Sequence, residues 1–156
     1  MKKGIVFILL FIAFSGSVYG PSKKREFCWQ YDYCYEIVEV SKQFKVDPRL
    51  TLAIILHESG LDVGDYALRQ KRFIRGNSGE YSIMQVMPAN FRPREDKFDP
   101  YTNITAGLRY YKTCSRRSRN TAENISKYNR GCSSKRVNRR YVERVLENYR
   151  KLGGKL

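Results

Sequence analysis

The sequence predicts a mainly α fold, and three observations support this. Apolar residues recur at helical spacing in most stretches beyond residue 33, and no convincing pair of alternating strands occurs. Hydrophobic residues make up 42% of the chain, with 11 Gly and 5 Pro, which excludes a disordered or collagen-like protein. The 156 residues fit one domain, because domains commonly contain about 100 to 200 residues.

The first two helices are predicted between residues 34 and 60. From Cys34 to Phe44, one helical face carries the apolar residues Tyr35, Ile37, Val38, Val40 and Phe44. Asp47 is a typical N-cap, and Pro48 suits the first helical position, where no amide hydrogen is needed. Leu50 to Leu56 then form a largely buried helix that we expect to end near Gly60.

The middle of the chain is predicted to be irregular. Residues 61–79 have no clean period and end in a turn sequence, and their basic residues are Arg69, Lys71, Arg72 and Arg75. Residues 83–87 are apolar but are closed by Pro88, and Arg92-Pro93-Arg94 disfavours regular structure. We expect at most a short irregular β element here, in the Gly-rich loop before Tyr81.

Three more helices are predicted towards the C-terminus. The first spans Asn103 to Cys114, the second Thr121 to Tyr128 and the third Val137 to Leu152. The inward residues are expected to be Ile104, Gly107, Leu108 and Tyr111 in the first, and Val142, Val145, Leu146 and Tyr149 in the third.

The N-terminal 20 residues have the order of a secretory signal. Lys2 and Lys3 precede an apolar run from Ile5 to Phe14, and small residues follow. A membrane-spanning helix needs about 20 apolar residues, so a retained anchor is the weaker alternative. We expect a signal peptide at 1–20 and a domain at 21–156 that is exported to the periplasm or cell envelope, with no stable membrane span after processing.

The cysteines agree with export. All four, Cys28, Cys34, Cys114 and Cys132, follow the signal, and an even number in an exported chain predicts two disulfides in any of three pairings. A zinc site is the alternative, but there is no CxxC pair and the only histidine, His57, is far from every cysteine in sequence. We expect no metal and no cofactor.

The formal net charge of +15 would attract a polyanion. Charge alone fits nucleic acid, anionic lipid or an acidic polymer. The basic runs at 116–119 and 135–140 lack a recognition-helix pattern, and export removes most reasons to meet DNA. We therefore expect no nucleic-acid partner.

Glu58 is the candidate catalytic residue, because it closes the most apolar predicted helix. A carboxyl group held against such a core loses hydration, which raises its pKa, as a general acid near neutral pH requires. The alternative is a solvated glutamate in a last helical turn, beside the negative end of the helix dipole.

Five segments, in their order along the chain, resemble the soluble lytic transglycosylase family, from about Cys34 to Tyr149. They are Glu58-Ser59-Gly60, SIMQVMP at 82–88, DPYTNITAGLRY at 99–110, YNRG at 128–131 and YVERVL at 141–146. The resemblance implies a lysozyme-like, mainly helical domain. Its groove would hold the glycan strand of peptidoglycan, which is cleaved between N-acetylmuramic acid (MurNAc) and N-acetylglucosamine (GlcNAc).

The resemblance also implies the roles of single residues. Glu58 would be the sole acid and base: it would protonate the glycosidic oxygen and then deprotonate the muramoyl C6 hydroxyl, which closes a 1,6-anhydro ring without water. The substrate-binding residues implied are Ser59, Met84, Gln85, Tyr128, Asn129 and Tyr141, the last with its hydroxyl near Glu58. Core packing is the alternative for Met84 and Tyr141.

The chain departs from the family pattern in two places. Ser82 stands where glycine is common, and the interval from Glu58 to Gln85 is several residues longer than usual. Ordinary glycosidases use two carboxylates, and no motif marks a second one here. This absence favours the reaction without water. A goose-type-like lysozyme that hydrolyses the same bond stays open as the nearest alternative, as does a binding module on an inactive scaffold. The sequence does not distinguish wall turnover, a secretion, pilus or conjugation apparatus, and phage action, although the small size suits a specialised, localised enzyme.

Overall fold

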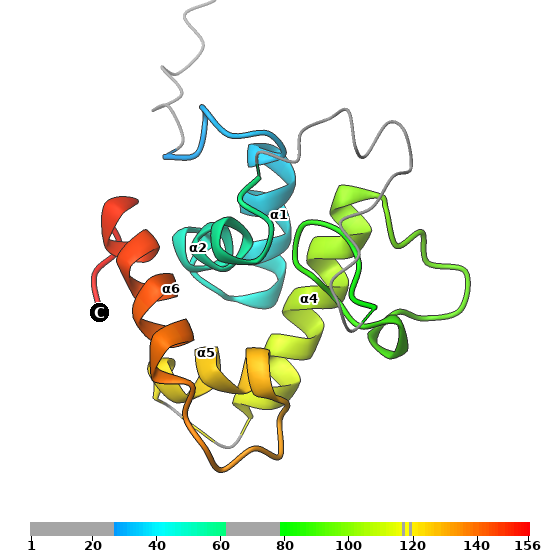
Figure 1. Ribbon diagram of the computed structural model, residues 1–156. Coiled ribbons are helices and arrows are strands. Elements are labelled where there is room, and N and C mark those ends of the chain that lie inside the picture. The colour runs from blue at the N-terminus through cyan, green and yellow to red at the C-terminus, as the bar shows by residue number, and fades with distance from the viewer. Residues whose placement is uncertain (1–26, 62–78, 117, 119) are drawn as a thin grey trace, which may run out of the picture.

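Helices make up nearly all of the regular structure. The structure is a computed structural model that describes residues 27–61, 79–116, 118 and 120–156. Its elements are α1 (Cys34–Phe44), α2 (Pro48–Glu58), the 3-10 helix η1 (Pro88–Asn90), α4 (Pro100–Ser115), α5 (Thr121–Arg130) and α6 (Arg139–Lys151) (Figure 1). Within these ranges the β pairing consists of one isolated antiparallel bridge, Tyr81 to Val86. The predicted mainly α fold is confirmed.

Several predicted boundaries differ from the structure for local reasons. Helix α4 begins at Pro100, three residues early, because Asp99 caps it: the Thr102 amide donates to Asp99 Oδ2 at 2.8 Å. The β bridge uses Tyr81 itself and lies after the Gly-rich stretch. Tyr35, expected on the inward face of α1, is 75% exposed. With 3.6 residues per turn, it lies opposite the buried Ile37 and Val40.

Three predicted segments lie outside the described residues. They are the signal peptide at 1–20, the first residues of the predicted domain at 21–26, and nearly all of the basic loop, including Arg69, Lys71, Arg72 and Arg75. Among the residues that are described, no helix has the length and hydropathy required to cross a membrane.

Helix α2 is the centre of the core and fixes the place of Glu58. Four of its side chains, Leu52, Ala53, Ile54 and Ile55, are completely buried, and it packs against α1 and α6. Tyr149 near the end of α6 donates to Asp47 at the start of α2 at 2.7 Å. The two helices therefore run in opposite directions, and Glu58 at the end of α2 faces the first turn of α6.

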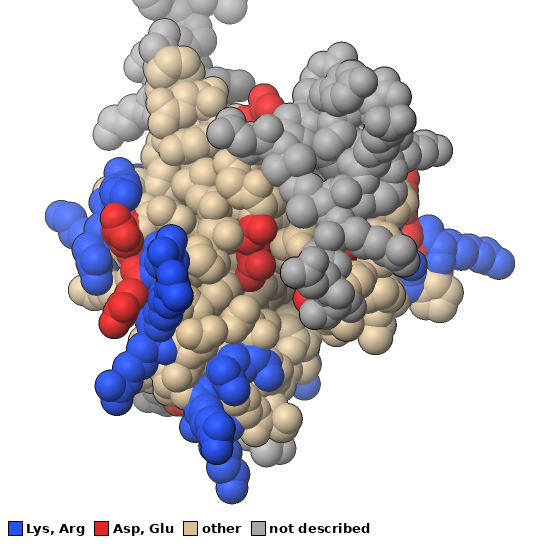
Figure 2. All heavy atoms as spheres, in the orientation of Figure 1, with Lys and Arg blue, Asp and Glu red and all other residues tan. Residues whose placement is uncertain are grey.

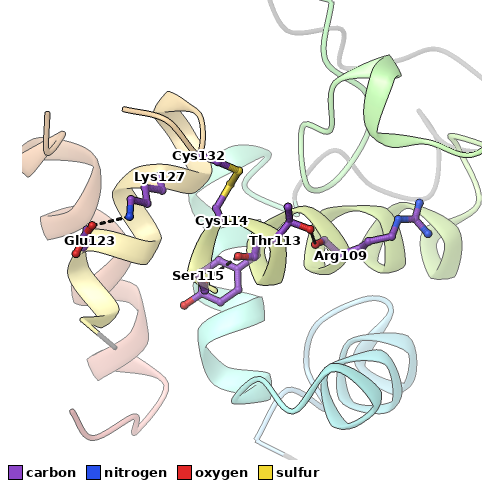
Figure 3. Close-up of a disulfide and its surroundings, with 8 residues drawn as sticks. Arg109, Thr113, Cys114, Ser115, Glu123, Lys127 and Cys132 are labelled. Carbon is purple, nitrogen blue, oxygen red and sulfur yellow. Dashed lines mark hydrogen bonds and ion pairs between the residues drawn. A yellow bond between two sulfur atoms is a disulfide. The ribbon is translucent and has the colours of Figure 1, made fainter. Parts of the chain in front are cut away.

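The four cysteines form two disulfides, Cys28–Cys34 and Cys114–Cys132. Figure 3 shows the second bridge, which joins the last turn of α4 to the segment after α5. Since Tyr128 and Asn129 lie at the end of α5, this bridge holds the part of the chain that carries them.

Candidate active site

A groove of about 480 Å³ opens beside the end of α2. Its other walls come from the bridge segment, η1, α4 and the end of α5. The lining residues are Glu58, Glu80, Gln85, Val86, Met87, Asn90, Tyr110, Tyr128, Asn129, Arg130 and Gly131. Segments far apart in the sequence thus meet around one carboxyl group.

Glu58 has the environment of a carboxylic acid that stays protonated near neutral pH. Burial raises its pKa from 4.5 to about 7, against the opposing effect of a hydrogen bond from Tyr141. The Tyr141 hydroxyl donates to Glu58 Oε1 at 2.5 Å, and burial together with the Glu58 charge raises the pKa of Tyr141, which keeps its proton. Tyr141 comes from the first turn of α6, whose N-cap is Asn138.

Glu80 is a second carboxylate on the groove wall that sequence reasoning did not single out. It directly precedes the bridge residue Tyr81, and its charge adds to the rise in the pKa of Glu58. The sequence carried no motif around this residue, and only the folded bridge segment places it beside the groove.

We expect the cleavage rate to fall as pH rises through about 7. A general acid must hold its proton, and kcat/KM reports the pKa of the free enzyme, so the alkaline limb should follow Glu58. Glu80→Gln removes a charge that raises this pKa and should move the limb to lower pH. The measurement is kcat/KM against pH for both proteins, and superimposable limbs would contradict the coupling of Glu80 to Glu58.

The segment from Tyr81 to Val86 is held in a tight loop by Asn103, whose role was also missed. The buried Asn103 accepts from the Met84 amide and donates to the Tyr81 carbonyl, both at 3.0 Å. Gln85 lines the groove, and its amide nitrogen donates to the Ser82 carbonyl at 2.8 Å. This arrangement holds Gln85 on the groove wall.

Met84 lies behind the groove and does not line it. Its side chain is fully buried against α4, where a Cβ added at Gly107 would come within 2.6 Å of the Met84 sulfur. The Met84 carbonyl accepts from the Tyr128 hydroxyl at 2.7 Å. The burial of Met84 matches the alternative of core packing. The neighbouring Gln85, whose backbone is left-handed, lines the groove instead.

The remaining predicted residues are divided between the groove and its support. Tyr128 and Asn129 line the groove, whereas Tyr141 reaches Glu58 without lining it. Ser59, expected to bind substrate, is not in the lining. Its hydroxyl donates to the Ile55 carbonyl at 3.2 Å and so closes α2.

Ser82 adopts the backbone conformation that a glycine would adopt easily. Its φ is 60°, in the left-handed region that costs a residue with a Cβ about 1 to 2 kcal/mol. Its hydroxyl is buried and has no hydrogen-bond partner among the described residues.

Ser82→Gly should therefore stabilise the protein by about 1 kcal/mol, because it relieves the left-handed strain at some cost in chain entropy. Denaturant unfolding measures the change. Ser82→Ala is the matched control, since it removes the hydroxyl and keeps the strain. Equal stability of the two variants would show that the strain relieved at Ser82 does not exceed the entropy cost of glycine, and it would contradict the prediction.

No metal site is evident in the part of the chain that the structure describes, where no three His, Cys, Asp or Glu side chains gather as ligands. The groove instead places Glu58 and a second carboxylate, Glu80, among amides and tyrosines, which are groups that hydrogen-bond sugars.

The sequence was compared with known protein families, and one of them matches most of the chain. Residues 36–150 match the Transglycosylase SLT domain. The chain belongs to this family. Membership explains the lysozyme-like helical fold and indicates a lytic transglycosylase that acts on the glycosidic bonds of peptidoglycan, outside the cytoplasm. The two disulfides, of which Cys114–Cys132 lies within the matched residues, fit an exported protein. No solved structure matches the chain.

Proposed function

We propose that this SLT domain cleaves the bond between MurNAc and GlcNAc and leaves a 1,6-anhydro-MurNAc end. The observation that carries the proposal is the state of Glu58, a carboxyl group in the groove whose pKa is raised to about 7. One group with a pKa near the working pH can both donate and accept a proton efficiently.

The proposed reaction has two proton transfers, both at Glu58. The protonated carboxyl gives its proton to the glycosidic oxygen as the bond to the muramoyl anomeric carbon breaks, and GlcNAc leaves as an alcohol. The substrate's own N-acetyl group meets the positive charge on the muramoyl ring. The Glu58 carboxylate then takes the C6 hydroxyl proton, and that oxygen attacks the anomeric carbon, which restores the acid.

Neighbouring residues are assigned supporting roles. Tyr141 holds the carboxyl by its hydrogen bond at 2.5 Å and is a positioning residue. Gln85 and Asn129 offer amide groups on the groove wall, which suit sugar hydroxyl and acetamido groups. Tyr128 presents its ring to the groove while its hydroxyl is occupied by the Met84 carbonyl. Met84 supports this wall from behind, and Ser59 closes the end of α2 that carries Glu58.

Glu80 favours a second candidate, hydrolysis of the same bond by a goose-type-like lysozyme mechanism. A second carboxylate beside the acid could position a nucleophilic water, as in ordinary glycosidases. Under the first proposal, Glu80 instead keeps Glu58 protonated and takes no part in the attack.

Mass spectrometry of digested peptidoglycan separates the two candidates. We expect muramoyl ends lighter than hydrolysed ends by the mass of one water, and the same product from Glu80→Gln. Reducing ends alone, with activity lost in Glu80→Gln, would establish the hydrolase. Glu80→Asp is the matched variant, because it keeps the charge and shortens the side chain.

We also propose that residues 1–20 direct export and that the domain at 21–156 acts in the periplasm or cell envelope. Disulfides persist in such oxidising compartments, which supports this setting. Such a domain would open the wall locally for a secretion, pilus or conjugation apparatus. N-terminal sequencing of the mature protein tests the first part, and an intact Met1 on secreted material would refute it.

A further inference from the structure

A second pocket, of about 450 Å³, adjoins the active-site groove at Asn129. Its lining residues are His57, Asn129, Asn138, Arg140, Tyr141 and Arg144. Asn129 lines both cavities, and the Asn138 side chain donates to it at 2.8 Å. The groove and this pocket therefore meet at Asn129, near the end of α5.

The pocket is positively charged. Arg140 and Arg144 lie one turn apart on the same face of α6. In the described part of the chain neither guanidinium has an ion-pair partner, and Glu147, farther along α6, is bonded to Lys151 at 2.7 Å. His57 is neutral at pH 7, because burial and nearby Arg144 lower its pKa. Figure 2 shows basic side chains gathered over α6 and the α5–α6 connection.

The pocket is one aromatic side chain away from Glu58. The ring of His57 meets the ring of Tyr141 edge-on, with centroids 4.7 Å apart, and the hydroxyl of Tyr141 bonds Glu58. A muramoyl sugar that reacts at its anomeric carbon carries its peptide stem on C3 of the same ring. The stem therefore starts on the sugar that reacts at Glu58, and Tyr141, which bonds Glu58, also lines the pocket.

We infer that Arg140 and Arg144 bind a free carboxylate of the peptide stem on the muramoyl residue being cleaved. Guanidinium groups match a carboxylate with two parallel hydrogen bonds, and such bonds are stronger than those between neutral groups. The side chain of Asn138 is already used by Asn129 and by the Tyr141 amide, so the arginines supply the recognition. The inference rests on the proposed function and makes peptide-bearing glycan the preferred substrate.

Binding without turnover tests this pocket. Soluble glycan strands are titrated calorimetrically into the Glu58→Gln protein with and without Arg140→Gln/Arg144→Gln. One sample of strands keeps its stems, and in the other the free carboxylates are amidated with carbodiimide and ammonia. We expect the arginine variant to bind native strands about three- to tenfold more weakly and to bind amidated strands as its parent does.

Arg136→Gln/Arg150→Gln is the matched control, because it removes the same charge from exposed positions outside the pocket. It should keep the preference for native strands. An unchanged affinity in the arginine variant, or an equal loss with both kinds of strand, would overturn the inference.

A parallel assay of cleavage by the parent protein distinguishes failure of the pocket proposal from failure of the proposed function. Cleavage without any preference for native strands rejects the pocket and leaves the proposed function standing. Arginine-dependent binding of native strands without cleavage rejects the proposed activity and leaves the pocket. No binding and no cleavage reject both.

Discussion

Glu58→Gln should lower the rate of peptidoglycan cleavage by about a hundredfold to ten-thousandfold, the usual loss when general acid–base catalysis is removed. Glutamine keeps the shape of the side chain and can still accept the hydrogen bond that Tyr141 gives to Glu58. It cannot donate a proton to the glycosidic oxygen or take one from the C6 hydroxyl. Release of soluble muropeptides measures the rate, and activity within a few-fold of the parent would remove Glu58 from the mechanism.

The free energy of unfolding of the same variant tests whether Glu58 is a buried acid. The pKa of Glu58 is raised from 4.5 to about 7, so the native protein binds this proton more tightly than the unfolded chain. The resulting stability is present below pH 4.5 and is lost as pH rises through 7, in total up to about 3 kcal/mol.

Glutamine does not titrate, so Glu58→Gln should gain stability relative to the parent between these pH values. Denaturant unfolding at pH 4 and pH 8 measures the difference. A constant difference between the two proteins would show that Glu58 is not a buried acid.

Removing the Cys114–Cys132 disulfide should cost about 3 kcal/mol. The bridge closes a loop with a sequence separation of 18, and a longer loop restricts the unfolded chain more. The double variant Cys114→Ala/Cys132→Ala should therefore melt about 6 to 12 °C lower. It should also cleave more slowly, because the end of α5 that carries Tyr128 and Asn129 loses its tie to α4.

Cys28→Ala/Cys34→Ala is the matched comparison, since that bridge has a sequence separation of only 6 and lies away from the groove. We expect a loss of about 2 kcal/mol there, with little change in rate. A larger loss from the short loop than from the long one would contradict the entropic account of these bridges.

The helices were predictable because their signals are local. Asp47 and Pro48 set the start of α2, and an almost unbroken apolar run fixes its burial. The start of α4 was missed by three residues because the periodic stripe begins later than the cap at Asp99. Tyr35 was misplaced because an aromatic residue was counted as inward although its helical angle points away from the core.

The site was predictable where one short motif carries it. Glu58 and Gln85 are marked by their own neighbours in sequence, and both line the groove. Glu80 and the basic pocket at Arg140 and Arg144 depend on how distant segments pack, which no single motif records. Met84 stands in the same short motif as Gln85, but its side chain is fully buried and packs against Gly107.

Digestion of peptidoglycan in water enriched in oxygen-18 tests the central claim most directly. If the C6 hydroxyl attacks the anomeric carbon, no solvent oxygen enters the product, and the muramoyl ends should carry none of the label. Hydrolysis would place one labelled oxygen at each new reducing end. Unlabelled 1,6-anhydro ends are the result we predict, and labelled reducing ends would contradict the account.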